Sequence, residues 1–183
     1  MADLTHSSRS IVRPYRTRSG SPRIVSLQES TAASTALIAV GNVVSFDLTD
    51  SAAHRIVRCS TSAGQTPILS TSFAGVAAEA STSDGSTTGL SNRLNRRLSV
   101  WTADPGTEFL FPTKVVIDST LVGTGLELSW DSTLNIHHVS ANSTAGDQRV
   151  WVTDIPPGTQ GDTGGYLIGK FFSTAVSPAV TLR

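Results

Sequence analysis

The sequence predicts an all-β protein, a small β-barrel or β-sandwich body with an extended N-terminal arm. Only 15% of its 183 residues are charged, against roughly 25% in an average soluble domain. Ser and Thr together account for 49 residues, a composition that excludes coiled coils and Lys/Glu-rich helical bundles. Beyond residue 23, short runs of alternating apolar and polar residues are separated by Gly, Pro, Asn and Asp. Such punctuated alternation is typical of strands joined by tight turns.

The first 23 residues predict a basic, extended arm. It holds one acidic residue and five arginines, a net charge of +4 on a body of net charge −4; the arginines are Arg9, Arg13, Arg16, Arg18 and Arg23. Pro14, Gly20 and Pro22 would interrupt a helix, and no apolar run follows the arginines as it would in a secretory signal. The arm is either a solvated tail or a segment that orders on an acidic partner. Its single aromatic residue and its lack of lysine argue against direct nucleic-acid binding.

The arm suggests a deletion experiment. Because the segment is polar and interrupted by Pro and Gly, we expect deletion of residues 1–23 to leave the melting temperature nearly unchanged. The same deletion should weaken binding to a partner.

The body, residues 24–183, predicts short strands throughout its length. In its first part they are expected at residues 24–27, 43–48, 55–59 and 73–80. A short helical turn or loop is expected up to about residue 95, followed by a strand through Trp101. Apolar or alternating runs follow at residues 115–117, 126–130, 136–139, 149–153, 166–172 and 179–182. The low-complexity segment 81–89 either divides two β subdomains or forms the tip of a long hairpin.

No set of residues predicts catalysis, a cofactor or a metal. The single cysteine, Cys59, excludes an intramolecular disulfide framework and a multi-thiolate zinc site. His137 and His138 are adjacent, so on a strand they would point to opposite faces and could not share one metal ion. The three tryptophans are expected to anchor the core or to form a sugar-stacking platform; they are Trp101, Trp130 and Trp151. A second basic cluster is either a solvated turn or a contact patch for an acidic partner; it consists of Arg93, Arg96 and Arg97.

Two segments resemble a known family. Residues 39–46, Ala-Val-Gly-Asn-Val-Val-Ser-Phe, are followed about thirty residues later by residues 73–80, Phe-Ala-Gly-Val-Ala-Ala-Glu-Ala. This pair of strands resembles the capsid decoration (cement) proteins of tailed bacteriophages. The resemblance implies a non-enzymatic β-protein on the outer surface of the virion, often a homotrimer, that bridges major capsid protein subunits. The N-terminus, which is unlike a secretory signal, predicts synthesis in the host cytoplasm, and the apolar runs are too short to span a membrane.

Two other classes of function stay open at this stage. One is another phage structural component, such as a head–tail joining, tail-tube or fibre-associated β-protein. The other is a carbohydrate-binding module or a β-barrel enzyme, which the tryptophans would serve as a stacking platform.

Overall fold

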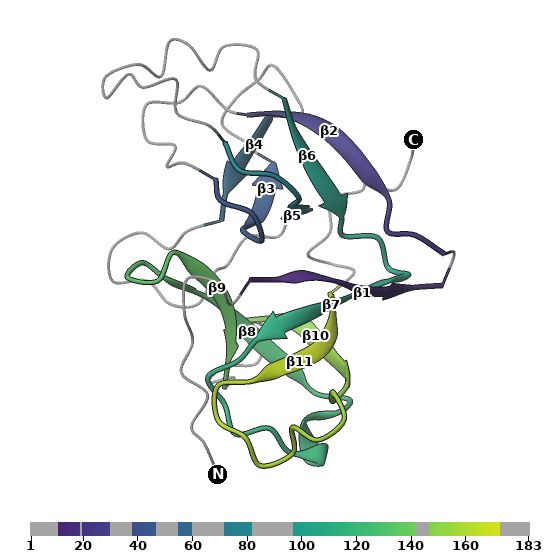
Figure 1. Cartoon of the computed structure of the whole chain (residues 1–183), viewed down its shortest axis with the longest axis vertical. Helices are drawn as coiled ribbons and strands as arrows, with labels where there is room; N and C mark the ends of the chain where they lie inside the picture. Colours follow the sequence, from purple (N-terminus) through teal and green to yellow (C-terminus); the bar gives the residue numbers. More distant parts are fainter. Residues whose placement is uncertain are drawn as a thin grey trace.

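The fold is all-β, as the sequence predicts. The computed structural model describes residues 11–18, 20–29, 38–46, 55–59, 72–81, 97–141 and 147–172. These residues form eleven strands and one short 3-10 helix: β1 (Arg13–Thr17), β2 (Ile24–Glu29), β3 (Val43–Phe46), β4 (Arg55–Arg58), β5 (Phe73–Ala77), β6 (Arg97–Thr102), β7 (Thr107–Pro112), η2 (Ser119–Leu121), β8 (Gly125–Asp131), β9 (Ile136–Ser140), β10 (Gln148–Asp154) and β11 (Tyr166–Phe171). They build a closed five-stranded barrel and a six-stranded sheet, which lie one above the other in Figure 1.

The barrel has the strand order β2-β4-β3-β5-β6, and pairing of β2 with β6 closes it. The β2–β4 pair is parallel, and the other pairs are antiparallel. Alternation along β6 turns Leu98 and Val100 into the barrel, where both are buried. Small and branched aliphatic side chains and one phenylalanine fill this narrow interior: Ile38, Val44, Phe46, Ile56, Ala74, Ala77, Leu98 and Val100.

The six-stranded sheet has the order β1-β7-β11-β10-β8-β9 and is antiparallel throughout. Three phenylalanines, Phe109, Phe111 and Phe171, pack on its inner face with ring centroids 5.3–6.1 Å apart. Beyond β7 the chain passes β9, the strand at the far edge of the sheet, where the Lys114 N–H donates to the Val139 carbonyl at 3.2 Å. The sheet therefore curls around its own aromatic core.

Two stretches differ from the sequence-based strands. Residues 107–112 form β7, a central strand that was not predicted, although it carries Phe109 and Phe111 of the core. Residues 115–117, predicted as an apolar run among the strands, lie in the connection between β7 and η2. There Val116 is 57% exposed, whereas Ile117 is fully buried and its backbone bonds to Gly161 and Asp162. One apolar anchor, rather than a paired strand, fixes this connection.

The N-terminal segment is not a free arm where the structure describes it. Residues 13–17 form β1, which pairs with β7, and Val12 is fully buried in the main core cluster. The expected boundary at residue 23 therefore differs from the structure. The apolar pair Ile11-Val12 lies between arginines in the sequence, and this pair ties the segment to the body. Residues 1–10, with Arg9, lie outside the described residues.

The boundary between the barrel and the sheet along the chain does not lie at residues 81–89, the position that the sequence suggested for a division between subdomains. That segment joins β5 to β6, which are neighbouring antiparallel barrel strands, so the hairpin alternative agrees with the topology. The chain instead passes between sheet and barrel at residues 18–23, after β1, and at residues 103–106, before β7. Both units thus depend on segments distant in sequence.

His137 joins the sheet to the barrel. Its Nδ1 accepts a hydrogen bond from the Val43 N–H at 3.1 Å, and its Nε2–H donates to the Cys59 carbonyl at 2.6 Å. These two partners fix a neutral imidazole with its proton on Nε2. Burial, followed by the nearby Arg58 charge and by His138, lowers the pKa of His137 from 6.5 to about 3, although the Cys59 hydrogen bond opposes this shift. Neutral His137 is thus part of the folded structure.

Trp130 and Arg58 extend this junction. The Trp130 ring, on sheet strand β8, lies with its centroid 4.7 Å from that of the His137 ring. The guanidinium of Arg58, on barrel strand β4, lies over the Trp130 ring at 4.2 Å from its centroid. Arg58 also donates to the Asn135 side-chain oxygen at 3.1 Å. Cys59 is a free, buried thiol in the same region, and burial raises its pKa to about 12. This thiol is therefore unreactive at neutral pH.

A close backbone approach inside the barrel leads to a stability prediction. Gly75 has a φ of +154°, and a Cβ built there would lie 2.0 Å from the Trp101 carbonyl oxygen. We expect Gly75→Ala to lower the free energy of unfolding by about 3 kcal/mol, because the β5–β6 ladder must separate. Gly158→Ala is the control: its φ is +79° but no atom lies within 4 Å, so it should cost only about 1 kcal/mol. Urea unfolding measures both, and equal losses would contradict the clash.

Candidate interaction surface

The structure divides the predicted arginines between two places. Arg13 and Arg16 lie on β1, the edge strand of the six-stranded sheet, and Arg18 follows the end of this strand. Arg23 precedes β2, and its carbonyl accepts the Thr102 N–H of the barrel at 3.0 Å. Arg97, on β6, donates to the Ser26 carbonyl at 3.0 Å, while Arg93 and Arg96 lie outside the described residues.

A row of side chains crosses four strands on the outer face of the sheet. Arg16 of β1 is paired in register with Glu108 of β7, and its Nε donates to Oε2 of that carboxylate. Lys170 of β11 lies on the other side, with Nζ 3.8 Å from Glu108 Oε1. Trp151 of β10 is the register partner of Lys170. The pairing of four strands thus assembles one continuous surface from residues 16, 108, 170 and 151.

Glu108 organises the charges of this row. Its side chain is only 10% exposed and holds Arg16 and Lys170 on either side. The hydrogen bond to Glu108, together with the attraction between the two charges, raises the pKa of Arg16 above its ordinary value. The same guanidinium is 3.7 Å from Asp154 through Nη2. The arrangement places two cations at fixed positions, with N–H groups left to face solvent.

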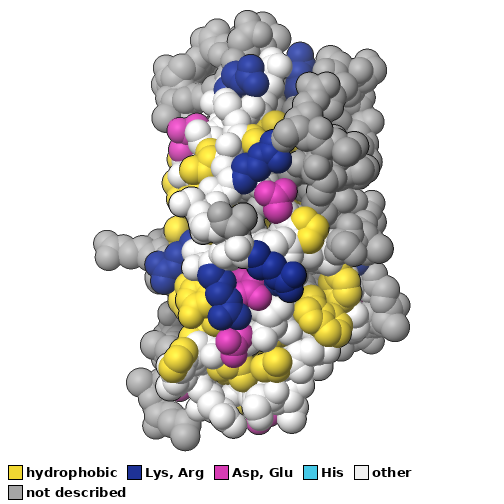
Figure 2. All heavy atoms as spheres, turned by 90° about the vertical axis from the view of Figure 1, so that its right-hand side faces the viewer, with side chains coloured by type: hydrophobic (Ala, Val, Ile, Leu, Met, Phe, Trp, Pro, Cys, Tyr) yellow, Lys and Arg dark blue, Asp and Glu magenta, His cyan; other side chains and the backbone are white. Residues whose placement is uncertain are grey.

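These charges border a hollow of about 290 Å³ between the end of β1 and the start of β7, lined by Arg16, Thr17, Arg18, Gly106, Glu108 and Lys170. The lining carries three cationic side chains against one carboxylate. The Arg18 side chain is exposed, and the backbone N–H of Arg18 donates to the Gly106 carbonyl at 3.2 Å. Figure 2 shows Lys and Arg side chains gathered around acidic ones near the middle of this side of the molecule. We name the surface formed by Arg13, Arg16, Arg18, Glu108, Trp151, Asp154 and Lys170 the arginine face.

The arginine face includes one exposed aromatic side chain, Trp151, and others adjoin it. Trp151 is 41% exposed and packs edge-on against Phe172 at 5.7 Å, and Tyr15 is 45% exposed. Arg13 lies over the Tyr166 ring at 5.7 Å, and Arg16 lies over Tyr15 at 5.6 Å. Arg, Tyr and Trp are the residues enriched at the centres of protein–protein interfaces. The composition of this face suits docking of a protein.

The outer edge of the sheet limits how a partner can dock. β1 is five residues long, contains Pro14 without an N–H group, and its register shifts between Pro14 and Arg16. Short strands with proline, arginine and a bulge resist addition of a further strand. A partner is therefore expected to contact side chains of the arginine face rather than extend the sheet.

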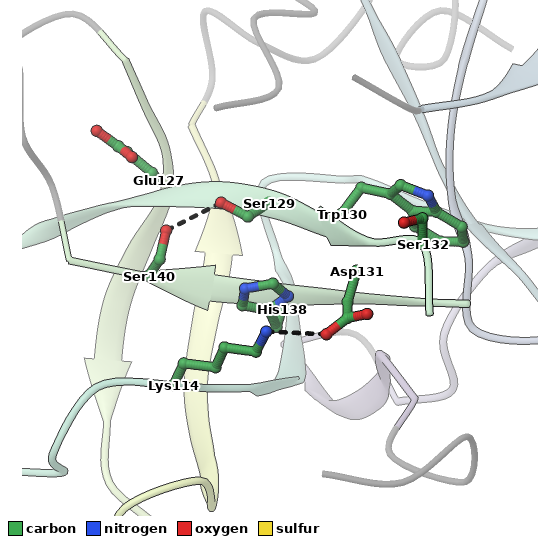
Figure 3. Close-up of a pocket in the computed structure, with 8 residues that line it drawn as sticks. All are labelled: Lys114, Glu127, Ser129, Trp130, Asp131, Ser132, His138 and Ser140. Atoms are coloured by element: carbon green, nitrogen blue, oxygen red, sulfur yellow. Dashed lines mark hydrogen bonds and ion pairs between the residues drawn. The ribbon is translucent and has the colours of Figure 1, made fainter. Parts of the chain in front are cut away.

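A second hollow, of about 380 Å³, lies beside the β8–β9 hairpin (Figure 3). It is lined by Lys114, Glu127, Ser129, Trp130, Asp131, Ser132, His138 and Ser140. Lys114 Nζ bonds to Asp131 Oδ2 at 2.8 Å, and the Ser129 and Ser140 hydroxyls bond to each other at 2.9 Å. The hydrogen bond from Lys114 is the largest cause of a lowered pKa of Asp131. His138 lines this hollow while His137 faces the barrel, so the predicted opposite orientation of the two histidines is confirmed.

The second hollow offers hydroxyls, carboxylates and an ammonium group, which can hydrogen-bond a small polyhydroxy ligand. An aromatic stacking surface is less available, because Arg58 and His137 already contact Trp130. Trp101 packs against the main core cluster, and Trp151 is part of the arginine face. The Trp130 ring packs against His137, and the Trp151 ring packs against Phe172. Among the described residues, no two tryptophan rings pack against each other.

Sequence reasoning named Arg13, Arg16 and Arg18 but missed Glu108, Lys170 and the placement of Trp151. Glu108 stands between Thr107 and Phe109 in the unpredicted strand β7. Recognition of Thr-Glu-Phe-Leu-Phe as an alternating run would have placed Glu108 on the face opposite the phenylalanines. The partners of Glu108 on β1 and β11, and the place of Trp151 on β10 beside Lys170, follow only from the strand order.

Comparison of the chain with family models, with curated proteins and with solved structures finds no match. Within the described segments, no three His, Cys, Asp or Glu side chains are grouped as the ligands of a metal ion would be. Among the described residues, no helix has the length and apolar character needed to cross a membrane.

Proposed function

We propose that this chain is a non-enzymatic structural protein of a phage particle. In this proposal it binds the outer surface of the capsid and stabilises it by bridging major capsid protein subunits. The observation that supports the proposal is the arginine face, a surface of charged and aromatic side chains built across four strands. The resemblance of residues 39–46 and 73–80 to capsid decoration proteins supports the choice of partner.

The charge distribution supports docking onto an acidic protein surface. The arginine face carries four cationic side chains and two carboxylates, a net charge of +2, and residues 1–23 carry +4 in total. Arginine forms bidentate, partly desolvated pairs with carboxylates more readily than lysine does. Exposed Trp151 adds the apolar contact that supplies affinity at the centre of an interface.

Repetition on a particle would strengthen such contacts. Each docking site of this size is weak, but an icosahedral shell presents it many times. A homo-oligomer of this chain, with a trimer favoured, would engage several capsid subunits together and gain affinity through effective concentration. The expected location is therefore the virion surface, after synthesis in the host cytoplasm.

The test uses empty shells assembled from the major capsid protein that is encoded in the same genome. The wild-type chain should co-sediment with shells and saturate at a fixed ratio. Trp151→Ala should weaken binding roughly tenfold or more, the loss typical of a tryptophan at the centre of an interface. Ile24→Ala is the control, since Ile24 is 56% exposed but belongs to barrel strand β2. Absence of saturable binding, or binding to tails instead of shells, would contradict the proposal.

The second hollow favours one alternative, a carbohydrate-binding β module. Its hydroxyl and carboxylate groups line a volume large enough for one sugar ring, with Lys114 and Asp131 at one side. A glycan array separates the two functions. Saturable glycan binding that Ser129→Ala and Ser140→Ala abolish, without shell binding, would support the alternative.

A further inference from the structure

The hollow beside Glu108 has the charge of a receptor for carboxylates. We propose that it binds the side chains of an acidic segment, with adjacent Asp or Glu residues, presented by the docking partner. This inference rests on the proposed function, because it names the chemistry of the partner at the arginine face. It is carried by the lining of the hollow, in which Arg16, Arg18 and Lys170 surround the single carboxylate of Glu108.

Glu108 satisfies only part of the hydrogen-bonding capacity of these cations. A guanidinium has five N–H groups and an ammonium has three. One carboxylate oxygen of Glu108 accepts a hydrogen bond from Arg16 Nε, and the other oxygen lies 3.8 Å from Lys170 Nζ. Arg18, at the end of β1, is exposed and lines the same hollow. Two further carboxylates would bring the net charge of the lining from +2 to zero.

The same geometry disfavours a polyphosphate or a nucleic acid. Glu108 stands within the hollow, and Asp154 lies 3.7 Å from Arg16 on its border, so both carboxylates would repel a phosphate backbone. Nucleic-acid binding also draws on an extended basic surface that neutralises several phosphates. The hollow offers a short, mixed-charge site bordered by Trp151 and Tyr15, which fits a protein segment better.

The experiment uses the full chain and a blocked tetrapeptide, Gly-Glu-Glu-Gly, with Gly-Gln-Gln-Gly as the neutral control peptide. Amide chemical shifts in two-dimensional NMR spectra are followed during titration. The acidic peptide should shift the amides of Arg18, Gly106 and Lys170, and the neutral peptide should not. Added salt should weaken the effect, because these charges are near solvent. Equal shifts with both peptides, or shifts confined to the barrel, would overturn the inference.

Variants test the hollow without the shell. The double variant Arg18→Gln/Lys170→Gln should bind the acidic peptide roughly tenfold more weakly, as expected when two charge pairs near the surface are lost. Arg97→Gln removes one charge from the barrel and should leave peptide binding unchanged. If the double variant does not fold, Arg18→Gln alone applies, since Arg18 is exposed, and it should lose about threefold. Unchanged binding in the folded variant would overturn the inference.

The two proposals fail in different ways. Peptide binding at the hollow without shell binding would overturn the proposed function and support this inference. Shell binding that the double variant leaves intact would support the function and overturn the hollow as its acceptor. A short oligothymidylate that shifts the same amides more strongly than the acidic peptide would overturn the inference in favour of a phosphate site.

Discussion

Deletion of residues 1–23 is expected to unfold the six-stranded sheet, the opposite of the nearly unchanged melting temperature that the sequence suggests. The deletion removes β1, so it exposes the edge of β7 and takes Val12 out of the core. Burial of one valine contributes about 2 kcal/mol, and the paired strand adds its ladder of hydrogen bonds. Glu108, at 10% exposure, would also lose the Arg16 guanidinium. Thermal unfolding followed by circular dichroism measures the loss.

Two substitutions in the same segment provide the matched comparison. Val12→Asp places a carboxylate at a fully buried position and should lower the free energy of unfolding by several kcal/mol. This is a large part of the roughly 5–15 kcal/mol by which a typical domain is stable. Tyr15→Asp alters a side chain that is 45% exposed and should leave the melting temperature within a few degrees. Equal tolerance of both substitutions, with a stable deletion variant, would mean that β1 is dispensable and the segment is a free arm.

Replacement of His137 is expected to loosen the junction between sheet and barrel. His137→Phe keeps an aromatic ring but leaves the Val43 N–H and the Cys59 carbonyl buried without their partner. Each such group costs about 1–3 kcal/mol, so the variant should lose roughly 3 kcal/mol or more at pH 7. Urea unfolding at pH 7 measures this loss, and a loss below about 1 kcal/mol would contradict the role of His137 in the junction.

The difference in stability between wild type and His137→Phe should also depend on pH. Above about pH 6.5, His137 is neutral in both the folded and the unfolded chain, so its stabilisation is fully present. As the pH falls further, only the unfolded chain takes up the proton, until the folded chain is protonated near its pKa of about 3. Wild-type stability should therefore fall by about 1.4 kcal/mol per pH unit from this residue. Between pH 7 and pH 5, the advantage of wild type over His137→Phe should shrink by roughly 2 kcal/mol; an unchanged advantage would show that His137 carries no such penalty.

Local alternation predicted most of the strands. Leu126 to Trp130 alternates apolar and polar residues and forms β8, and the adjacent histidines of β9 point to opposite sides. Alternation failed where other signals were stronger. The arginines on both sides of Ile11-Val12 obscured the buried anchor of β1, and β7 lies between the turn at Asp104-Pro105-Gly106 and Pro112.

The candidate site could be predicted only in part, for a physical reason. Local sequence identified the arginines of β1, because an excess of one charge is visible without a fold. Arg16 pairs with Glu108 of β7 and with Asp154 of β10, and Lys170 of β11 approaches Glu108. The strand order β1-β7-β11-β10 that brings these groups together depends on pairing between distant segments. A shift of one residue in any pairing would move Glu108 or Lys170 to the other face of the sheet. The hollow is thus a property of register, which local patterns do not encode.

The most direct measurement is a cryo-electron microscopy reconstruction of shells assembled from the major capsid protein of the same genome and saturated with this chain. The reconstruction should show the chain on the outer surface at symmetry-related positions that bridge neighbouring capsid subunits. The arginine face, with Trp151 and Lys170, should lie against the shell and meet acidic side chains there. A reconstruction in which the arginine face points to solvent, or in which saturated shells carry no added density, would contradict this account.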